Sequence, residues 1–306
     1  MNWLVKAAAF KLLSALPGGP ALYRYGQEHL THSLVPTPER VGQKIDVGLQ
    51  YWDWLAAHQP HKKPLGTHLD FGAGWHPTIP LLFYSLGVEQ QHLVDVAPLL
   101  DRGLIESTVK AFLKIVTEPG WAHRSRLQRL PDSVWDNEMP WTAYLKCLGV
   151  TCHAPFTGAE PELVGAIDFA TSTQVLYFIP REPLRSCFRQ LHRVLKTGGN
   201  FLATIHLNDV NATWQKGLSQ YNHLQYSPDV WDKWINSQLM SYNRLKAADY
   251  RQLLEEAGFQ ILHFDVTGPT AADLEELSRI PIHNSFSRYS REELGAKHLF
   301  FVAQKV

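Results

Sequence analysis

The sequence predicts an α/β protein in which helices surround a seven-stranded, mostly parallel sheet, with a helical segment in front of it. Short apolar runs of strand character alternate with segments of helical spacing from residue 67 onward. A glycine turn, FGAG, joins the first of these runs to the helix that follows. This alternation is typical of parallel strands connected by helices. At 306 residues, the chain is long enough to bury a substantial core.

Each predicted element rests on its own pattern of apolar residues. The expected strands are 67–71, 91–96, 148–153, 165–171, 199–206, 259–266 and 297–304. The expected helices are 77–86, 98–117, 181–195 and 246–257. Between the last two strands, the chain looks mostly irregular apart from a short helical piece at 271–278, which leaves room for one antiparallel strand.

The amino-terminal part has helical spacing of a different kind. Residues 3–16 form one expected helix, which Pro17-Gly18-Gly19-Pro20 ends. Residues 38–58 form a second, and the stretch PHKKP at 60–64 breaks it. We therefore expect a helical cap over residues 1–66 and a main domain over 67–306. The first helix carries a weak basic face, so packing on the protein's own core is favoured over a membrane surface.

Two longer segments stand outside the alternation. Residues 118–145 are rich in tryptophan and arginine, and residues 207–245 are rich in tryptophan, tyrosine and histidine. Both lie close to predicted strands, which makes them candidate walls of a substrate pocket. The alternative is that these aromatic side chains only fill the core.

Composition narrows the class of partner. The chain has 29 basic and 29 acidic residues, so no overall field attracts nucleic acid or an anionic membrane. The three cysteines show no CxxC spacing, and no apolar run reaches the length of a membrane span. Lys11 interrupts the apolar amino end, which disfavours a signal peptide. We expect a cytoplasmic protein with a small-molecule substrate, no nucleic-acid partner and no transmembrane segment.

The stretch HLDFGAGWHPTIP at residues 68–80 places the glycine turn between a strand and a helix. A turn at the carboxyl end of a parallel strand is where open α/β sheets bind nucleotides. A dinucleotide site would have a third glycine at position 77, where this chain has proline. Proline suits the first turn of a helix, because its missing N–H has no partner there.

LDFGAG resembles the first motif of class I S-adenosylmethionine-dependent methyltransferases, with Asp70, Gly72 and Gly74 in the matching places. Four further stretches resemble the family in order and spacing: HLVDVAPLL, AIDFATSTQVLYFIP, LHRVLKTGGNFLATI and LLEEAGFQIL. Together they cover residues 68–265. His76 stands where many members have a third glycine, and Thr197 replaces a proline. The resemblance implies a Rossmann-like sheet and S-adenosylmethionine as cofactor.

The chemistry of this cofactor agrees with the residues present. S-adenosylmethionine carries a sulfonium and an ammonium but no phosphate, so its site needs close backbone approach and carboxylates. Asp95 ends the second strand, where a carboxylate can accept both ribose hydroxyls, although a cap for the next helix is the alternative. The cofactor-binding residues that the resemblance implies are Asp70, Gly72, Gly74, Asp95, Val96, His153, Ala154, Thr171 and Ser172.

A hydroxyl acceptor would also need a base at the carboxyl ends of strands four and five. His206 is the first choice, because an imidazole titrates near neutrality. Tyr177 is a second catalytic candidate. Candidates for substrate contact are His76, His223 and Tyr226. No metal site is expected.

The sequence thus favours a methyltransferase acting on a small molecule, with an oxygen acceptor slightly ahead of nitrogen or sulfur. Two alternatives remain open: a nicotinamide-dependent oxidoreductase, and a non-catalytic binding protein on a methyltransferase scaffold.

Overall fold

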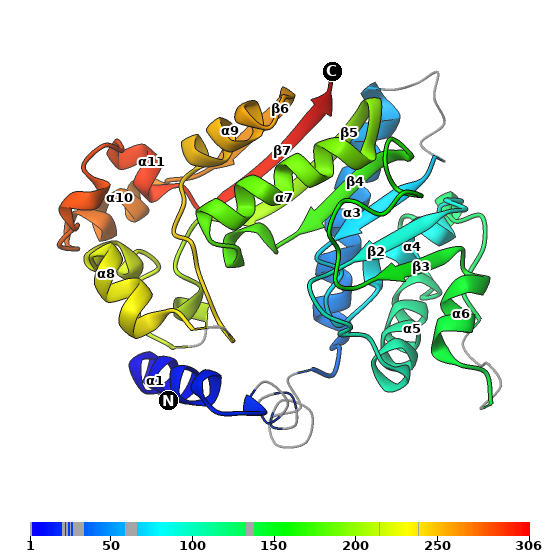
Figure 1. The fold of residues 1–306 in the computed structure, drawn as a ribbon, viewed down its shortest axis with the longest axis horizontal. Helices are drawn as coiled ribbons and strands as arrows, with labels where there is room; N and C mark the ends of the chain where they lie inside the picture. Colours follow the sequence, from blue (N-terminus) through cyan, green and yellow to red (C-terminus); the bar gives the residue numbers. More distant parts are fainter. Residues whose placement is uncertain are drawn as a thin grey trace. The chain divides into compact units, whose positions relative to one another are not determined.

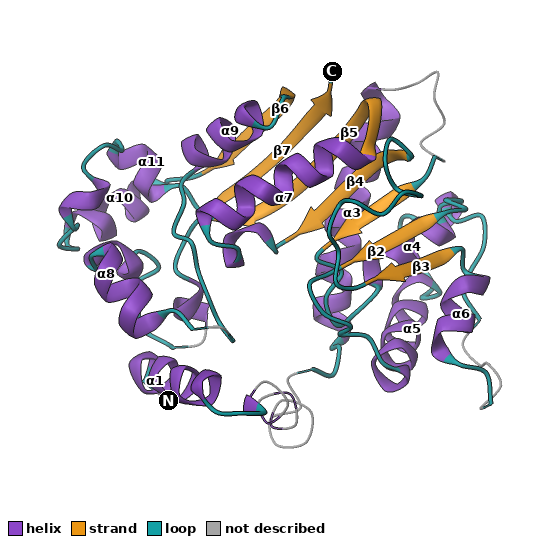
Figure 2. Ribbon diagram, viewed as in Figure 1, coloured by secondary structure: helices purple, strands orange, loops and turns teal. Residues whose placement is uncertain are grey.

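The structure is a computed structural model. It describes residues 2–19, 34–58, 66–132, 138–213, 215–237 and 239–306, together with residues 22, 24 and 26. Strands and helices alternate along most of this length, as Figures 1 and 2 show. The predicted break at 60–64 lies outside the described residues.

Seven strands form one sheet in the order β3-β2-β1-β4-β5-β7-β6. The strands are β1 (His68–Phe71), β2 (Gln91–Val94), β3 (Val150–His153), β4 (Ile167–Thr173), β5 (Leu195–His206), β6 (Phe259–Thr267) and β7 (His298–Lys305). β1 pairs in parallel with both β2 and β4, and β2 pairs in parallel with β3. The predicted α/β class and mostly parallel seven-stranded sheet are confirmed.

Helices precede and follow these strands along the chain. The longer ones are α1 (Trp3–Ala15), α3 (Pro38–His58), α4 (Thr78–Ser85), α5 (Arg102–Val116), α6 (Trp141–Cys147), α7 (Arg181–Val194), α9 (Ala247–Glu256) and α10 (Ala271–Ser278). The shorter ones are η2 (Arg124–Arg126), η3 (Leu176–Phe178), η4 (Val210–Thr213), η5 (Asn222–Gln225), α8 (Pro228–Val230), η6 (Trp231–Ile235), η7 (Asn284–Phe286) and α11 (Arg291–Gly295). Within the described residues, no helix is long and apolar enough to cross a membrane.

The chain divides into two compact units. The first comprises residues 1–31, 174–189 and 203–303, and the second comprises residues 32–173, 190–202 and 304–306. In the second unit, α3 packs against α4, α5 and β4, and it buries Val41, Ile45 and Leu49. In the first unit, α1 buries Trp3 and Phe10, and the Trp3 ring meets those of Tyr226 and Trp231. The cap boundary at residue 66 stays a prediction.

β7 runs antiparallel to β5. Just beyond the end of β5, the N–H of Leu207 donates to the carbonyl of Lys297, just before β7 begins. At the other end, Nζ of Lys305 donates to the carbonyl of Leu195, the first residue of β5. The antiparallel strand for which the sequence left room is therefore the last one.

The sequence missed some helices and misplaced some ends. α5 begins at Arg102, not at residue 98, because the side chain of Asp101 accepts a hydrogen bond from the N–H of Leu104 and caps the helix there. α6 begins in the segment 118–145, and α11 lies in the stretch before β7 that looked irregular. Both are short helices, and short helices give few apolar repeats for a pattern to detect.

Candidate functional site

The glycine turn after β1 is held by hydrogen bonds to β2. Gly72 and Gly74 have φ angles of +75° and +65°, in the left-handed region that glycine adopts without steric cost. The N–H groups of Gly72 and Ala73 both point to the carbonyl of Val94, at 2.9 and 3.3 Å. The turn therefore sits directly against the carboxyl end of β2.

Asp95 links the same turn to the end of β2. Its Oδ2 accepts a hydrogen bond from the N–H of Gly74 at 3.0 Å, and its Oδ1 accepts one from the N–H of Val96 at 2.7 Å. Burial raises its pKa, while these backbone bonds lower it. Since Asp101 caps α5, the alternative role for Asp95 as a helix cap does not apply.

Asp70 lies under the turn and is 5% exposed. Burial raises the pKa of its carboxyl to about 6, and the charge of Lys44 and a hydrogen bond from Thr171 oppose that rise. Oγ1 of Thr171 also lies 2.8 Å from Nε2 of His68, so the hydroxyl connects the carboxyl to a buried histidine. Because β1 pairs in register with β4, Asp70 and Thr171 are partners across the sheet.

These residues fit the cofactor that the sequence implies. A Cβ built on Gly74 would meet only the carbonyl of Gly72, at 3.8 Å, so the turn leaves room for close approach. The hydroxyl oxygens of Ser172 and Thr78 are buried without a hydrogen-bond partner in the described part of the chain. Two carboxylates and two unpartnered hydroxyls suit a cationic, phosphate-free adenosine derivative.

The other predicted cofactor residues occupy varied surroundings. The side chain of Val96 is 83% exposed. The ring of His153 contacts another histidine: its Nε2 lies 3.0 Å from Nδ1 of His92. Ala154 is joined to Pro155 by a cis peptide bond. His76 does not face open space through its Nε2, which is hydrogen-bonded to the carbonyl of Leu34. Its role as a substrate contact stays a prediction.

The first unit has a partly open cavity, whose space of about 310 Å³ includes open solvent. Its walls come from η3, the end of β5 and the chain between η4 and α9. The lining residues are Tyr177, His206, Leu207, Asn208, Asp209, Val210, His223, Trp231, Tyr242, Asn243, Arg244 and Leu245. Three predicted site residues, Tyr177, His206 and His223, therefore lie around one cavity, whereas Tyr226 is not part of its lining.

His206 and Tyr177 lie close together in this wall. Their rings meet edge to face, with centroids 5.9 Å apart. Nδ1 of His206 lies 3.0 Å from Nδ1 of His298, so one of these two nitrogens carries a hydrogen and the other accepts it. Burial lowers the pKa of His206 to about 4, with a further lowering from His298. The imidazole is therefore neutral at pH 7.

A cluster of charged side chains beside His223 was not predicted from the sequence. Nζ of Lys246 is fully buried and lies 3.0 Å from both the carbonyl of Leu207 and Nε2 of His223. Nη1 of Arg244 donates to the carbonyls of His223 and Tyr226, and its guanidinium lies over the Trp231 ring. Burial lowers the pKa of Lys246 to about 7 and that of Arg244 to about 10.

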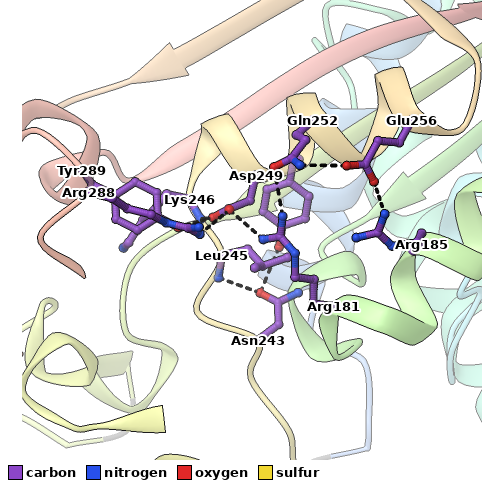
Figure 3. Close-up of polar contacts among 11 residues, drawn as sticks. Arg181, Arg185, Asn243, Leu245, Lys246, Asp249, Gln252, Glu256, Arg288 and Tyr289 are labelled. Carbon is purple, nitrogen blue, oxygen red and sulfur yellow. Dashed lines mark hydrogen bonds and ion pairs between the residues drawn. The ribbon is translucent and has the colours of Figure 1, made fainter. Parts of the chain in front are cut away.

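Asn243 and Asp249, on either side of Arg244 and Lys246 in the sequence, hold this loop in place, and Figure 3 shows their contacts with Leu245, Lys246 and two arginines. The side chain of Asn243 donates to the carbonyls of Leu176 and Ile179 and accepts from the N–H of Leu245. Asp249 accepts from the backbone N–H of Lys246 and pairs with Arg181 and Arg288. Arg244 itself has a φ of +56°, which is uncommon for a residue other than glycine. The sequence signal was only a polar run, NRLKAAD, before a helix.

The segment 118–145 makes different contacts from those expected of a pocket wall. Arg129 donates from Nε and Nη2 to the carbonyls of Tyr84 and Val88, at the end of α4. Arg124 donates to the carbonyl of Val116, at the end of α5. The carbonyls of Tyr84 and Val116 lie in the last turns of α4 and α5, where a carbonyl has no partner within the helix, and Val88 lies just beyond α4. A role of this segment in substrate binding stays a prediction.

Comparisons with known proteins bear on the family. A family model described as "Methyltransferase domain" matches residues 41–264, which is almost three quarters of the chain. No curated protein matches the chain.

Several solved structures are similar at low sequence identity. Geranyl diphosphate C-methyltransferase from Streptomyces coelicolor A3(2) is 10% identical with a TM-score of 0.46, over 88% of this chain and 84% of that one. The [4+2]-cyclase SpnF is 17% identical with a TM-score of 0.42, over 84% and 80%. A putative sarcosine dimethylglycine methyltransferase from Galdieria sulphuraria is 17% identical with a TM-score of 0.42, over 89% and 92%.

Proposed function

Since the chain belongs to the methyltransferase domain family and is an S-adenosylmethionine-dependent methyltransferase, we propose that it methylates a small-molecule acceptor, with an oxygen acceptor favoured over nitrogen or sulfur. The assignment of the methyl-donor site rests on the glycine turn flanked by Asp70 and Asp95, at the carboxyl ends of two adjacent parallel strands. The cofactor, when bound, supplies an activated methyl group on a positively charged sulfur.

The residues of the turn have distinct tasks in this proposal. Asp95 accepts hydrogen bonds from the ribose hydroxyls, and the N–H of Gly74 keeps its carboxylate in place. Asp70 offsets the positive charge of the cofactor from a buried position. The buried hydroxyl of Ser172 supplies a further hydrogen bond.

The cavity of the first unit supports the acceptor part of the proposal. Tyr177, Trp231 and Tyr242 give it aromatic walls, and His206, Asp209 and Arg244 add polar groups, which is the kind of lining that small-molecule sites have. His206 accepts the proton of a hydroxyl acceptor, because its ring is neutral and one nitrogen keeps a lone pair. An amine or thiol acceptor would need less help from a base, so the presence of a neutral histidine favours oxygen.

A two-stage experiment tests the function. Calorimetry with S-adenosylmethionine and S-adenosylhomocysteine measures donor binding, and Asp95→Ala serves as the comparison. Incubation of the protein with methyl-labelled donor and a metabolite extract measures transfer, and the labelled product is identified by mass spectrometry. Label on a small-molecule oxygen supports the proposal. Donor binding without transfer to any small molecule contradicts it.

A further inference from the structure

His223 leaves a hydrogen-bond donor without an acceptor. The side chain is 3% exposed and lines the cavity of the first unit. A protonated Lys246 can only donate, so Nε2 of His223, 3.0 Å away, must accept. Burial, with Lys246 and Arg244 beside it, holds the pKa of His223 well below its usual range, so the ring is neutral. Its hydrogen is then on Nδ1, which has no partner within the described residues.

Two cations lie beside this donor. Arg244 and Lys246 are both cations, and within the part of the chain that the structure describes neither forms an ion pair with a carboxylate. Asp249, the nearest carboxylate in sequence, is already paired with Arg181 and Arg288 (Figure 3). Among the described lining residues Asp209 is the carboxylate, and it accepts from Asn222 and from the N–H of Asn211. The charges of Asp209 and Asp232 act on Arg244, and those of Asp209 and Asp249 act on Lys246, without an ion pair to either cation.

A buried N–H without a partner, next to a guanidinium that forms no ion pair within the described residues, favours an oxygen that carries negative charge. The lining also includes the aromatic rings of Tyr177, Trp231 and Tyr242, which favour a ligand with an apolar group next to that oxygen. One guanidinium and one unpartnered N–H in the described lining match the two oxygens of a carboxylate better than the three oxygens of a phosphate. The side chains therefore indicate both the polar and the apolar part of the ligand.

We infer that this cavity binds a small carboxylic acid, whose carboxylate accepts the Nδ1–H of His223 and is held by the charge of Arg244. This rests on the proposed function only in that the acid is taken as the methyl acceptor; binding of the acid is independent of transfer. Lys246 is a positioning residue, because it orients the imidazole through Nε2. Asn243 and Asp249 fix the loop that carries both cations.

Calorimetry with the full chain tests this at pH 6.5. The probes are benzoate and 3-phenylpropanoate, each with its neutral amide, together with benzylamine and phenyl phosphate. We expect each acid to bind at least about tenfold more tightly than its amide, and benzylamine to bind more weakly still. Amides that bind as well as the acids, phenyl phosphate tighter than benzoate, or no acid binding at 10 mM would each overturn the inference.

Variants separate recognition from folding. Arg244→Gln and His223→Phe are expected to reduce the preference for acid over amide to less than about threefold, whereas His223→Gln, which keeps an N–H donor, retains part of it. Arg279→Gln, an exposed residue paired with Glu275, is the matched control and keeps the full preference. Each variant must bind S-adenosylhomocysteine as the wild type does, which shows that it has folded. A wild type that prefers acids but binds no S-adenosylhomocysteine contradicts the proposed function and leaves this inference standing.

Discussion

Oγ1 of Thr171 lies 3.2 Å from Oδ1 of Asp70 and donates a hydrogen bond to it across two adjacent parallel strands. This contact is buried on both sides, since Thr171 is 0% and Asp70 is 5% exposed. A donated hydrogen bond favours the ionised carboxyl, whereas burial favours the protonated one. Burial prevails, and the pKa of Asp70 is raised to about 6.

Donor binding is therefore expected to depend on pH near 6. Above that value Asp70 is ionised and attracts the cationic cofactor; as the pH falls through about 6, the attraction is lost and the dissociation constant of S-adenosylmethionine rises. Thr171→Val removes the opposing hydrogen bond and should move the midpoint to higher pH. Calorimetry between pH 5 and 8 measures this. In Asp70→Asn the pH dependence should vanish; persistence of the wild-type midpoint in that variant would contradict the assignment.

The same carboxyl should make the ligand-free protein less stable at high pH. A carboxyl whose pKa is raised in the folded state binds its proton more tightly there than in the unfolded chain, so stability falls as the pH rises through about 6. The difference between about 6 and the ordinary 3.8 corresponds to about 3 kcal/mol. This stability is lost as the pH rises from about 3.8 to about 6, so Asp70→Asn should stabilise the ligand-free protein at pH 8 and not at pH 3.5, as measured by urea unfolding. Asp46→Asn, on the exposed side of α3, serves as control and should change neither value.

Asp95 gives a third prediction. Asp95→Ala should weaken S-adenosylmethionine binding by about 1 to 3 kcal/mol, because hydrogen bonds from the ribose are left unmade. Asp101→Ala is the matched control: it removes the cap of α5 and should lower the free energy of unfolding by about 0.5 to 2 kcal/mol without changing donor affinity. The two variants are compared by calorimetry and by thermal unfolding. Equal affinity for the donor in Asp95→Ala and wild type would remove Asp95 from the site.

The glycine turn was predictable from the sequence because local chain geometry determines it. Asp70, Gly72 and Gly74 are close in sequence, and the register of β1 with β2 brings Asp95 to them. Arg244, which lines the cavity, and Lys246, which lies next to His223, were not predictable in the same way. Their meeting with His223 depends on contacts between segments more than twenty residues apart, which leave no periodic pattern. The partners of Thr171 and His76 were missed for the same reason.

His206 and His298 give a prediction about catalysis. If His206 donates from Nδ1 to His298, its Nε2 keeps the lone pair that a base needs. His206→Gln should then lower kcat/KM by about 10²- to 10⁴-fold. His298→Phe leaves the tautomer of His206 unfixed and should lower kcat/KM by a smaller factor.

The pH profile of the rate tests the same base. Because the pKa of His206 is lowered to about 4, the base is neutral and its contribution to the rate is constant between pH 6 and 8; this contribution disappears only as the pH falls through about 4. A rate that titrates with His206 near pH 7 would refute this.

Lys246 should make acid binding depend on pH in the opposite direction from donor binding. Burial and the charge of Arg244 lower its pKa to about 7, while Asp209 and Asp249 oppose that change. Below pH 7 the ammonium is present and Nε2 of His223 must accept from it; above pH 7 it is lost, together with the need for a hydrogen on Nδ1. Benzoate affinity should therefore fall as the pH rises from 6 to 8.5. Binding at pH 8 should take up protons, which calorimetry in buffers of different ionisation enthalpy detects.

Lys246→Met should abolish both effects. Because it removes a fully buried ammonium, retained S-adenosylhomocysteine binding is needed as evidence that the variant folds. A benzoate affinity that stays constant over this range in the wild type would mean that Lys246 does not control the hydrogen on His223.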